Sequence, residues 1–260
     1  MSLDPSPLRG RSAVVTGVSR RVGIGFAVAR RLLDLGARVF VQSWVPYDET
    51  TTWGTDPGGL DAVLSELSAA GEVEHVAADF GDPTAPREVI GTAQRAFGRL
   101  DILVVNHARS EQGGLEEVTA EQLDAHLIEN VRASLLLVKE FAARRDGGPG
   151  GRVVLLTSGQ HLAPMSNELA YAVSKGALHQ ATLSLSDALI ERGITVNAVN
   201  PGPTDTGWGL GDRPAPPAMP QGRWGVPDDA ARLIGWLCTD DAAWITGQVI
   251  DSEGGFRRWG

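Results

Sequence analysis

The sequence predicts a doubly wound α/β fold, in which a parallel sheet of about seven strands is covered by helices on both faces. Short apolar runs rich in β-branched residues recur along the 260 residues, and longer segments with helical periodicity separate most of them. The short runs are almost continuously apolar, as expected for strands buried on both faces. Because strands that alternate with helices are joined by right-handed crossovers, one parallel sheet can hold all of the runs. We therefore expect a single domain over residues 1–260.

The expected strands follow one another along the whole chain. They cover residues 12–16, 38–41, 73–77, 102–105, 153–156, 194–199 and 248–250. Helix-end signals lie between them, since Gly36 and Gly193 suit helix C-termini and Pro227 suits a first helical turn. Thr119 and Gln122 predict a capping box at the start of a long helix.

Two long irregular stretches, residues 44–59 and 201–226, are rich in glycine and proline, and each follows an expected strand. Ligands of doubly wound proteins bind beyond the carboxyl ends of the strands, so both stretches should border the ligand site. Loops longer than about 12 to 15 residues are usually functional lids or disordered segments. We expect residues 203–226 to be the substrate loop, with a mobile lid over residues 207–222.

The composition narrows the classes of partner. A net charge of −9 argues against nucleic acid or anionic lipid as a non-specific partner. There is no apolar run of about 18 residues that could span a membrane, and residues 1–10 lack the apolar core of a secretory signal. Cys238 is the only cysteine, and His161 with Glu168 lacks a third metal ligand at suitable spacing. We expect a cytoplasmic protein with no metal site.

A glycine-rich loop, residues 16–25, joins the first expected strand to an amphipathic helix that extends to Leu35. Gly17 and Gly23 let the backbone approach a pyrophosphate, and the N–H groups at the start of the following helix attract the anion. The alternative is a plain tight turn. The position of the loop after the first strand favours dinucleotide binding in a Rossmann fold.

The end of the second strand bears on the choice of dinucleotide. A carboxylate there would accept a hydrogen bond from the ribose of NAD and repel the additional phosphate of NADP. The strand ends at Ser43, whereas Asp48 comes several residues later, and Arg20 and Arg21 offer guanidinium groups suited to phosphate. We favour NADP(H) and leave NAD(H) open, because Ser43 tolerates either cofactor.

Tyr171 and Lys175 form the most informative pair in the chain. The protein has two tyrosines and only two lysines, Lys139 and Lys175, so chance rarely places a lysine four residues after a tyrosine. Residues four apart share a helix face, and an ammonium near a phenol favours ionisation of the phenol. We therefore expect Tyr171 to give or take a proton near neutral pH.

From about residue 10 to residue 256, the chain resembles the short-chain dehydrogenase/reductase family. The tyrosine and lysine of that family fall on Tyr171 and Lys175, its active-site serine on Ser158, and its helix asparagine on Asn130. The resemblance implies that Tyr171 donates a proton during hydride transfer and that Ser158 binds the substrate oxygen. It further implies that Lys175 lowers the pKa of the phenol and that Asn130 supports a water in the proton relay.

The resemblance also implies the cofactor contacts. These are Gly17, Ser19, Arg20, Arg21, Gly23, Ile24, Ser43, Trp44, Asp79, Phe80, Asn106, His107, Ala108, Tyr171, Lys175, Pro201, Gly202, Thr204 and Thr206. The chain departs from the family pattern in two places, since its glycine loop is two residues longer and Arg109 replaces a glycine. We expect His107 to have a structural hydrogen-bonding role, with substrate contact as the alternative.

The expected substrate residues are Gln160, His161, Met165 and Trp208, and we expect Leu162 and Glu168 to line the same pocket. The resemblance favours a carbonyl reductase similar to β-ketoacyl-carrier-protein reductases, which converts a ketone to a secondary alcohol. Two alternatives stay open: an NAD-dependent secondary-alcohol dehydrogenase, and a non-catalytic protein that senses NADP(H). The family usually forms tetramers through two long helices, here residues 119–142 and 170–192, so a homotetramer, or else a homodimer, is expected.

Overall fold

The computed structural model of the protein describes residues 4–145, 147–207 and 215–259. Its centre is a seven-stranded parallel sheet with the strand order β3-β2-β1-β4-β5-β6-β7. The strands are β1 (Ser12–Thr16), β2 (Arg38–Ser43), β3 (Val73–Ala77), β4 (Ile102–Val105), β5 (Gly151–Leu156), β6 (Ile194–Asn200) and β7 (Val249–Asp251). The predicted doubly wound fold is confirmed. All seven predicted strands are present, and their ends differ from prediction by at most two residues.

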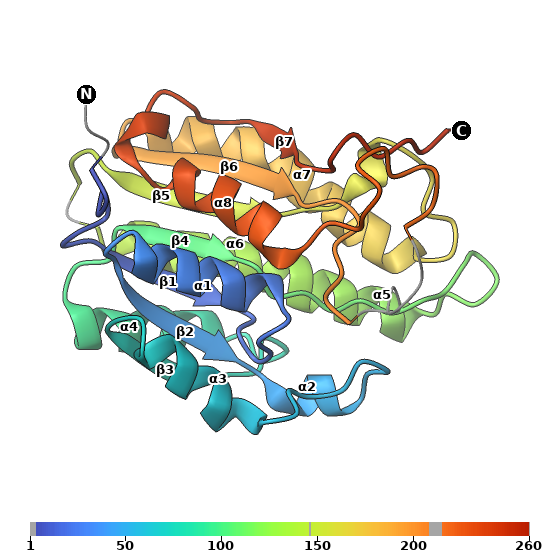
Figure 1. Cartoon of the computed structure of the whole chain (residues 1–260), viewed down its shortest axis with the longest axis horizontal. Coiled ribbons are helices and arrows are strands. Elements are labelled where there is room, and N and C mark those ends of the chain that lie inside the picture. Colours follow the sequence, from blue (N-terminus) through green and yellow to red (C-terminus); the bar gives the residue numbers. More distant parts are fainter. Residues whose placement is uncertain (1–3, 146, 208–214, 260) are drawn as a thin grey trace.

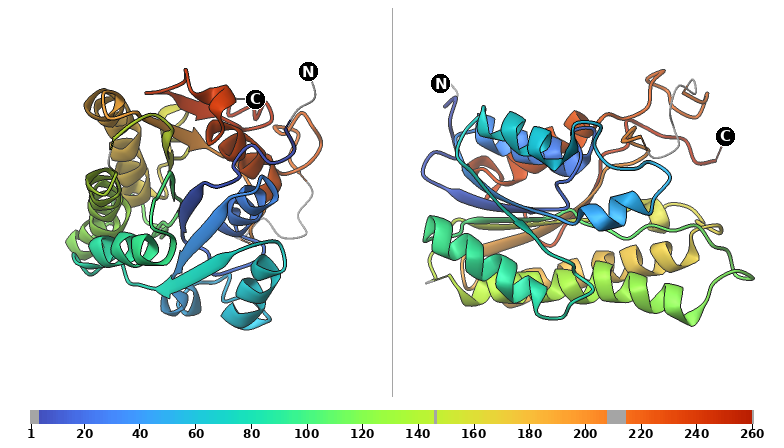
Figure 2. Two further views of the ribbon diagram at one scale, coloured as in Figure 1. Left: turned by 90° about the vertical axis from the view of Figure 1, so that its left-hand side faces the viewer. Right: turned by 90° about the horizontal axis from the view of Figure 1, so that it is seen from below.

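Helices cover both faces of this sheet, so the molecule has three layers (Figures 1 and 2). One face carries α1 (Ile24–Asp34), α3 (Gly59–Ser68) and α8 (Pro227–Leu237). The other face carries α4 (Ala85–Phe97), α5 (Ala120–His126), α6 (Ala133–Ala143) and α7 (Leu169–Ile190). Each layer of helices encloses an apolar core against the sheet. Burial on both faces explains why β4 is apolar throughout and why every residue of β6 is buried.

The helix signals in the sequence have local physical counterparts. Gly36 has a φ of 94° just after α1, and Pro227 begins α8. Thr119 accepts a hydrogen bond from the backbone N–H of Gln122 at the start of α5. The side chain of Gln122 instead donates to the carbonyl of Gln112, so only half of the predicted capping box forms.

The long helix predicted from Thr119 has a feature that the periodicity does not show. A π-helical segment, η1 (Leu127–Arg132), separates α5 from α6. This wider turn contains Asn130, whose side chain is bound to groups outside the helix. π-Turns inside helices often occur at functional sites.

The carboxyl ends of the strands all face one edge of the molecule, on the right in Figure 1, where α2 and the C-terminal segment also lie. The stretch 44–59, predicted to be irregular, holds the short helix α2 (Val45–Glu49), with Pro46 in its first turn, and ends where α3 begins. In the stretch 201–226, Thr204 and Gly225 form a parallel bridge that ties the two ends together. Residues 208–214, which include Trp208 and much of the predicted lid, lie outside the described residues.

Two shorter helical turns complete the description, η2 (Gly159–His161) after β5 and η3 (Asp240–Ala242) after α8. None of the described helices combines the length and apolar character needed to cross a membrane. Among the described residues, no three histidine, cysteine or acidic side chains are grouped to hold a metal ion.

Candidate active site

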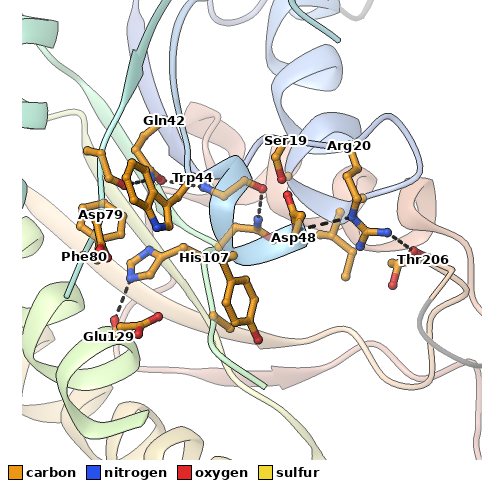
Figure 3. Close-up of a pocket in the computed structure, with 18 of the residues that line it drawn as sticks. Ser19, Arg20, Gln42, Trp44, Asp48, Asp79, Phe80, His107, Glu129 and Thr206 are labelled. Atoms are coloured by element: carbon orange, nitrogen blue, oxygen red, sulfur yellow. Dashed lines mark hydrogen bonds and ion pairs between the residues drawn. The ribbon is translucent and has the colours of Figure 1, made fainter. Parts of the chain in front are cut away.

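Two adjoining cavities lie at the carboxyl edge of the sheet. The first has a volume of about 240 Å³ and is lined by the segments that follow β1 to β4 (Figure 3). The second has a volume of about 770 Å³ and is lined by the segments that follow β4, β5 and β6, by the start of α7 and by Arg258. Arg20, Ile24, Trp53 and Thr206 line both cavities, so the two form one continuous groove.

The glycine-rich loop forms the floor of the first cavity. Gly17 has a φ of 73°, and a side chain on Gly25 would begin 2.4 Å from the carbonyl oxygen of Gly17. The amide nitrogen of Asn106 donates to the carbonyls of Thr16 and Gly17, both at 3.0 Å, which fixes the loop against the end of β4. Among the described residues, no side chain caps the N-terminus of α1 at Gly23. Close backbone packing and an uncapped helix start fit a bound pyrophosphate.

Most of the predicted cofactor residues line this groove. The first cavity takes Gly17, Ser19, Arg20, Gly23, Ile24, Trp44, Asp79, Phe80, Asn106, His107, Ala108 and Thr206, and the second takes Tyr171, Pro201, Gly202 and Thr204. Three do not line either cavity: Arg21, Ser43 and Lys175. The hydroxyl of Ser43 is buried against Nε2 of His75 at 2.8 Å, which explains its absence from the wall.

The two arginines of the loop point to different partners. Arg21 forms an ion pair with Asp56 at 2.7 Å and lowers the pKa of that carboxyl to about 2. Arg20 stays on the groove, where its Nη1 donates to the carbonyl of Thr206 at 3.0 Å and its guanidinium lies 5.8 Å from the centre of the Trp53 ring. Of the two arginines expected to suit an additional phosphate, Arg20 lies on the groove, whereas Arg21 is paired with Asp56.

Asp48 is a member of the first cavity that the sequence reasoning discounted. α2 places its carboxyl group on the wall beside Arg20, with Oδ1 3.9 Å from the arginine Nε. Burial raises the pKa of Asp48, and its Oδ2 atom has no hydrogen-bond partner in the described part of the chain. A carboxylate on the wall could accept a hydrogen bond from a ribose hydroxyl.

His107 is a structural member of the same wall. Its Nδ1 lies 2.8 Å from Oγ1 of Thr16, and its Nε2 lies 3.0 Å from the carbonyl oxygen of Glu129. Since a carbonyl only accepts, Nε2 carries the proton and Nδ1 accepts from Thr16. Burial lowers the pKa of His107 to about 3, so the ring is neutral. Both ring nitrogens are engaged, and His107 does not line the second cavity.

Arg109, which replaces the usual glycine, turns away from the groove. Its guanidinium forms ion pairs with Glu111 and Glu129, both at 2.7 Å, and lies 5.5 Å from the centre of the Tyr47 ring. The Tyr47 hydroxyl in turn accepts from the backbone N–H of Ser110 at 2.8 Å. This network ties α2 to the segment after β4, and neither its tyrosine nor its arginine was among the predicted site residues.

Ser158 and Tyr171 line the second cavity together. Burial raises the pKa of Tyr171 to about 12, and a hydrogen bond with Ser158 opposes that rise. The Nζ atom of Lys175 lies 5.6 Å from the centre of the Tyr171 ring and donates to the carbonyl of Leu156 at 2.8 Å. The predicted lowering of the phenol pKa is therefore wrong for this arrangement, because burial dominates and the lysine is directed at a carbonyl.

Lys175 itself is strongly affected by its surroundings. It is only 2% exposed, and burial lowers its pKa to about 8. Its carbonyl also accepts from the hydroxyl of Thr157 at 3.1 Å, which holds this turn of α7 against the end of β5. Tyr171 therefore lies on the cavity wall with Ser158, whereas Lys175 lies behind this wall.

Asn130 connects α7 to the segment after β4. Its Oδ1 accepts from the backbone N–H of Arg109 at 2.7 Å, and its Nδ2 donates to the carbonyl of Arg109 and to Oγ of Ser174, both at 2.9 Å. Its own carbonyl accepts from the hydroxyl of Ser134 at 2.5 Å. Asn130 is fully buried, so it positions the wall instead of lining it.

Only some of the predicted substrate residues line the second cavity. Met165 lines the second cavity, whereas Gln160 and His161 do not, and Trp208 lies outside the described residues. Gln160 instead accepts from the backbone N–H of Ser158 at 3.2 Å, and His161 pairs with Asp251 at 3.2 Å. Wall residues that were not predicted as substrate contacts include Ser110, Gln112, Asn167 and Arg258. They come from distant parts of the chain, so no local motif marks them.

The chain matches known proteins over nearly its full length. A family profile described as enoyl-(acyl carrier protein) reductase matches residues 17–257. A protein of Bacillus subtilis described as an uncharacterized oxidoreductase is 40% identical over 251 residues, which cover 95% of this chain and 96% of that protein. NADPH-dependent aldehyde reductase 2 of Arabidopsis thaliana, a chloroplast protein, is 33% identical and the match covers 98% of this chain and 97% of that protein.

Solved structures agree with the fold. A short-chain dehydrogenase/reductase from Serratia marcescens has a TM-score of 0.83 at 33% identity, covering 96% of this chain and 99% of that chain. A short-chain dehydrogenase from Burkholderia cenocepacia, solved in complex with NADP, has a TM-score of 0.84 at 33% identity, covering 96% and 98% of the two chains.

Proposed function

The chain belongs to the short-chain dehydrogenase/reductase family, and on this premise we propose that it is a carbonyl reductase that converts a ketone to a secondary alcohol with Tyr171 as the proton donor. Members of this family use NAD(H) or NADP(H). The observation that carries the proposal is the placement of Ser158 and Tyr171 in a cavity that is continuous with the glycine-loop groove.

The groove suits a nicotinamide dinucleotide. Gly17 and Gly25 leave room for a pyrophosphate beside the start of α1. Oδ2 of Asp48, which has no hydrogen-bond partner within the described residues, offers an acceptor on the wall. When bound, the cofactor supplies the hydride. The protein residues then have to orient the substrate carbonyl and donate a proton to its oxygen.

The remaining chemistry follows from the two hydroxyl groups. Ser158 donates a hydrogen bond to the carbonyl oxygen, where negative charge develops as hydride reaches the carbon. Tyr171 then transfers its proton to this oxygen, which completes the alcohol. The high pKa of Tyr171 keeps the phenol protonated at neutral pH, the state that reduction requires.

NADP(H) is the proposed cofactor. Arg20 supplies a cation on both cavities, and two similar proteins are described as NADPH-dependent or as bound to NADP. The second candidate function is an NAD-dependent secondary-alcohol dehydrogenase. Asp48 favours it, because a buried carboxylate on the wall beside Arg20 repels an additional phosphate.

Oxidation of NADPH and of NADH with a panel of ketones and β-ketoacyl thioesters tests the proposal. The expected result is turnover of at least one ketone, with higher kcat/KM for NADPH. Faster alcohol oxidation with NAD would favour the second candidate. Cofactor binding without turnover of any carbonyl or alcohol would contradict both and support the non-catalytic sensing protein.

For the assembly we propose a homotetramer. Leu127, Leu135, Val173, Leu183 and Ile190 are exposed apolar side chains on η1, α6 and α7. A second exposed group, Trp236 and Trp244, lies at and beyond the end of α8. Two separate apolar surfaces fit a tetramer with two kinds of interface. Light scattering of Leu183→Arg, with expected loss of the tetramer, tests this.

A further inference from the structure

Glu168 stands out among the residues that line the second cavity. It lies three residues before Tyr171, at the start of α7, and lines the same cavity as Tyr171 and Ser158. Its backbone is held on both sides: its N–H donates to the carbonyl of Met165 at 3.1 Å, and it forms a parallel bridge with Gly113. The backbone that carries this carboxyl group is therefore fixed at the entrance to α7.

The charges of the cavity leave this carboxylate uncompensated. The described wall carries three charged side chains: Arg20, Glu168 and Arg258. Arg20 has Asp48 and the carbonyl of Thr206 as neighbours, and Arg258 forms an ion pair with Glu253. Within the described residues, Glu168 has no ion pair and its carboxyl group accepts no hydrogen bond, while partial burial raises its pKa.

A carboxylate in this position is only partly hydrated, so a ligand of opposite charge would stabilise it. Moving a charge out of water weakens its hydration, and an opposite charge or strong donors on the ligand restore what is lost. The neighbouring wall residues Gln112 and Asn167 are polar but neutral, so they leave the negative charge in place. The cavity thus combines a carbonyl-binding pair, Ser158 and Tyr171, with a separate anionic position.

We propose that Glu168 selects substrates that carry a positively charged nitrogen within a few bonds of the carbonyl group, so that the substrate class is the amino ketones and the product class the amino alcohols. The proposal rests on the carbonyl reductase function above. It adds to that function a specificity-determining residue and a charge on the substrate.

The same arrangement links recognition to the proton donor. The charge of Glu168 is one of the causes that raise the pKa of Tyr171, after burial. Loss of the Tyr171 proton places a second negative charge in the cavity, and a bound cation offsets the first. A cationic substrate should therefore have both a higher kcat and a lower KM. A substrate that carries only an additional hydroxyl group gains hydrogen bonds but no such compensation of charge.

Matched ketones test the proposal. β-Dimethylaminopropiophenone carries a protonated amine, isopentyl phenyl ketone is its neutral carbon isostere, and β-benzoylpropionate carries a carboxylate. With the wild-type protein, we expect kcat/KM to be roughly tenfold or more higher for the amine than for the neutral ketone. Glu168→Gln should bring this ratio to about one and improve the carboxylate substrate relative to the neutral ketone.

Glu116→Gln is the matched control, because Glu116 is an exposed carboxylate that does not line the cavity. It should leave the preference for the amine intact. Equal ratios in wild type and Glu168→Gln would overturn the proposal.

A binding measurement keeps this inference separate from the proposed function. Isothermal titration of the three ketones into the protein saturated with NADP⁺ needs no turnover. If the amine binds more tightly than the other two ketones and Glu168→Gln abolishes this difference, the role of Glu168 in charge selection is supported. This holds even if no ketone is reduced, and in that case only the reductase proposal fails. Absence of any preference for the amine in both binding and turnover contradicts the role of Glu168.

Discussion

The guanidinium of Arg258 lies where a side chain on Gly159 would begin. A Cβ atom added to Gly159 would be 1.9 Å from Nη2 of Arg258. Gly159 directly follows Ser158, and Arg258 belongs to the C-terminal segment, where it pairs with Glu253 and lies 4.9 Å from the centre of the Phe256 ring. The C-terminal segment therefore packs on the residue that follows the serine, and a Cβ atom there would force the Arg258 side chain to move.

We predict that Gly159→Ala displaces Arg258 and raises KM more than it lowers kcat, because Arg258 lines the second cavity. The loss of stability should be about 1–3 kcal/mol, the usual range for overpacking. Thermal unfolding of the single and double variants measures the coupling. In an Arg258→Ala background, Gly159→Ala should have almost no further effect, and additive losses would refute the packing argument.

Gly176→Ala is the matched control for this substitution. Gly176 lies inside α7, and a Cβ atom there would meet only Cγ of Gln160 at 3.9 Å, an ordinary contact. Alanine favours a helix interior over glycine by about 1 kcal/mol, so the control should be neutral or more stable.

Tyr171→Phe should bind cofactor normally and lose turnover by at least about 100-fold, the lower end of what a general acid contributes. The aromatic ring keeps its packing and only the hydroxyl is removed, so the unfolding temperature should change little. Quenching of intrinsic fluorescence by the cofactor measures binding, and initial rates measure turnover. A variant that retains most of the wild-type rate would exclude Tyr171 as the proton donor.

Much of this site is readable from the sequence because its residues lie in local patterns. Strands buried on both faces are mostly apolar, and a glycine loop followed by a helix is a contiguous signal. Tyr171 and Lys175 are one helical turn apart, so their spacing carries information without any tertiary contact. These features predicted the fold and the main positions of the groove.

The remaining features depend on contacts between distant segments. Asp56 forms an ion pair with Arg21, and Lys175 donates a hydrogen bond to the carbonyl of Leu156 and not to the phenol. No sequence motif predicts either contact. Asp48 was discounted by its distance from the end of β2, yet the short helix α2 returns it to the wall. Charge partners and loop paths are tertiary outcomes, so residue type alone could not predict them.

Asp48→Ser should shift cofactor preference toward NADPH. Removing a buried carboxylate beside Arg20 removes repulsion of an additional phosphate, and we expect the ratio of kcat/KM for NADPH over NADH to rise roughly tenfold or more. Arg20→Ala should move the ratio in the opposite direction. Asp61→Asn, at an exposed site on α3, is the control and should leave the ratio unchanged. A ratio that falls in Asp48→Ser would contradict this role for the carboxylate.

His107 should make the protein sensitive to acid. Its pKa is about 3 in the folded protein against an ordinary value of 6.5, so between these values the unfolded chain holds a proton on this ring that the folded protein does not. Stability therefore falls as the pH falls below 6.5, by about 1.4 kcal/mol per pH unit from this residue. In His107→Asn that part of the pH dependence should disappear.

Urea unfolding of wild type and His107→Asn at several pH values between about 5 and 7 measures this difference. The variant also loses the ring's contacts with Thr16 and Glu129, so its stability at neutral pH should be lower. The test is therefore the slope against pH and not the stability at one pH. The two curves should approach each other as the pH falls, because only the wild type has to keep a neutral imidazole buried against protonation. Parallel curves would mean that folding does not shift the pKa of His107, and the account of a buried ring that stays neutral would then be wrong.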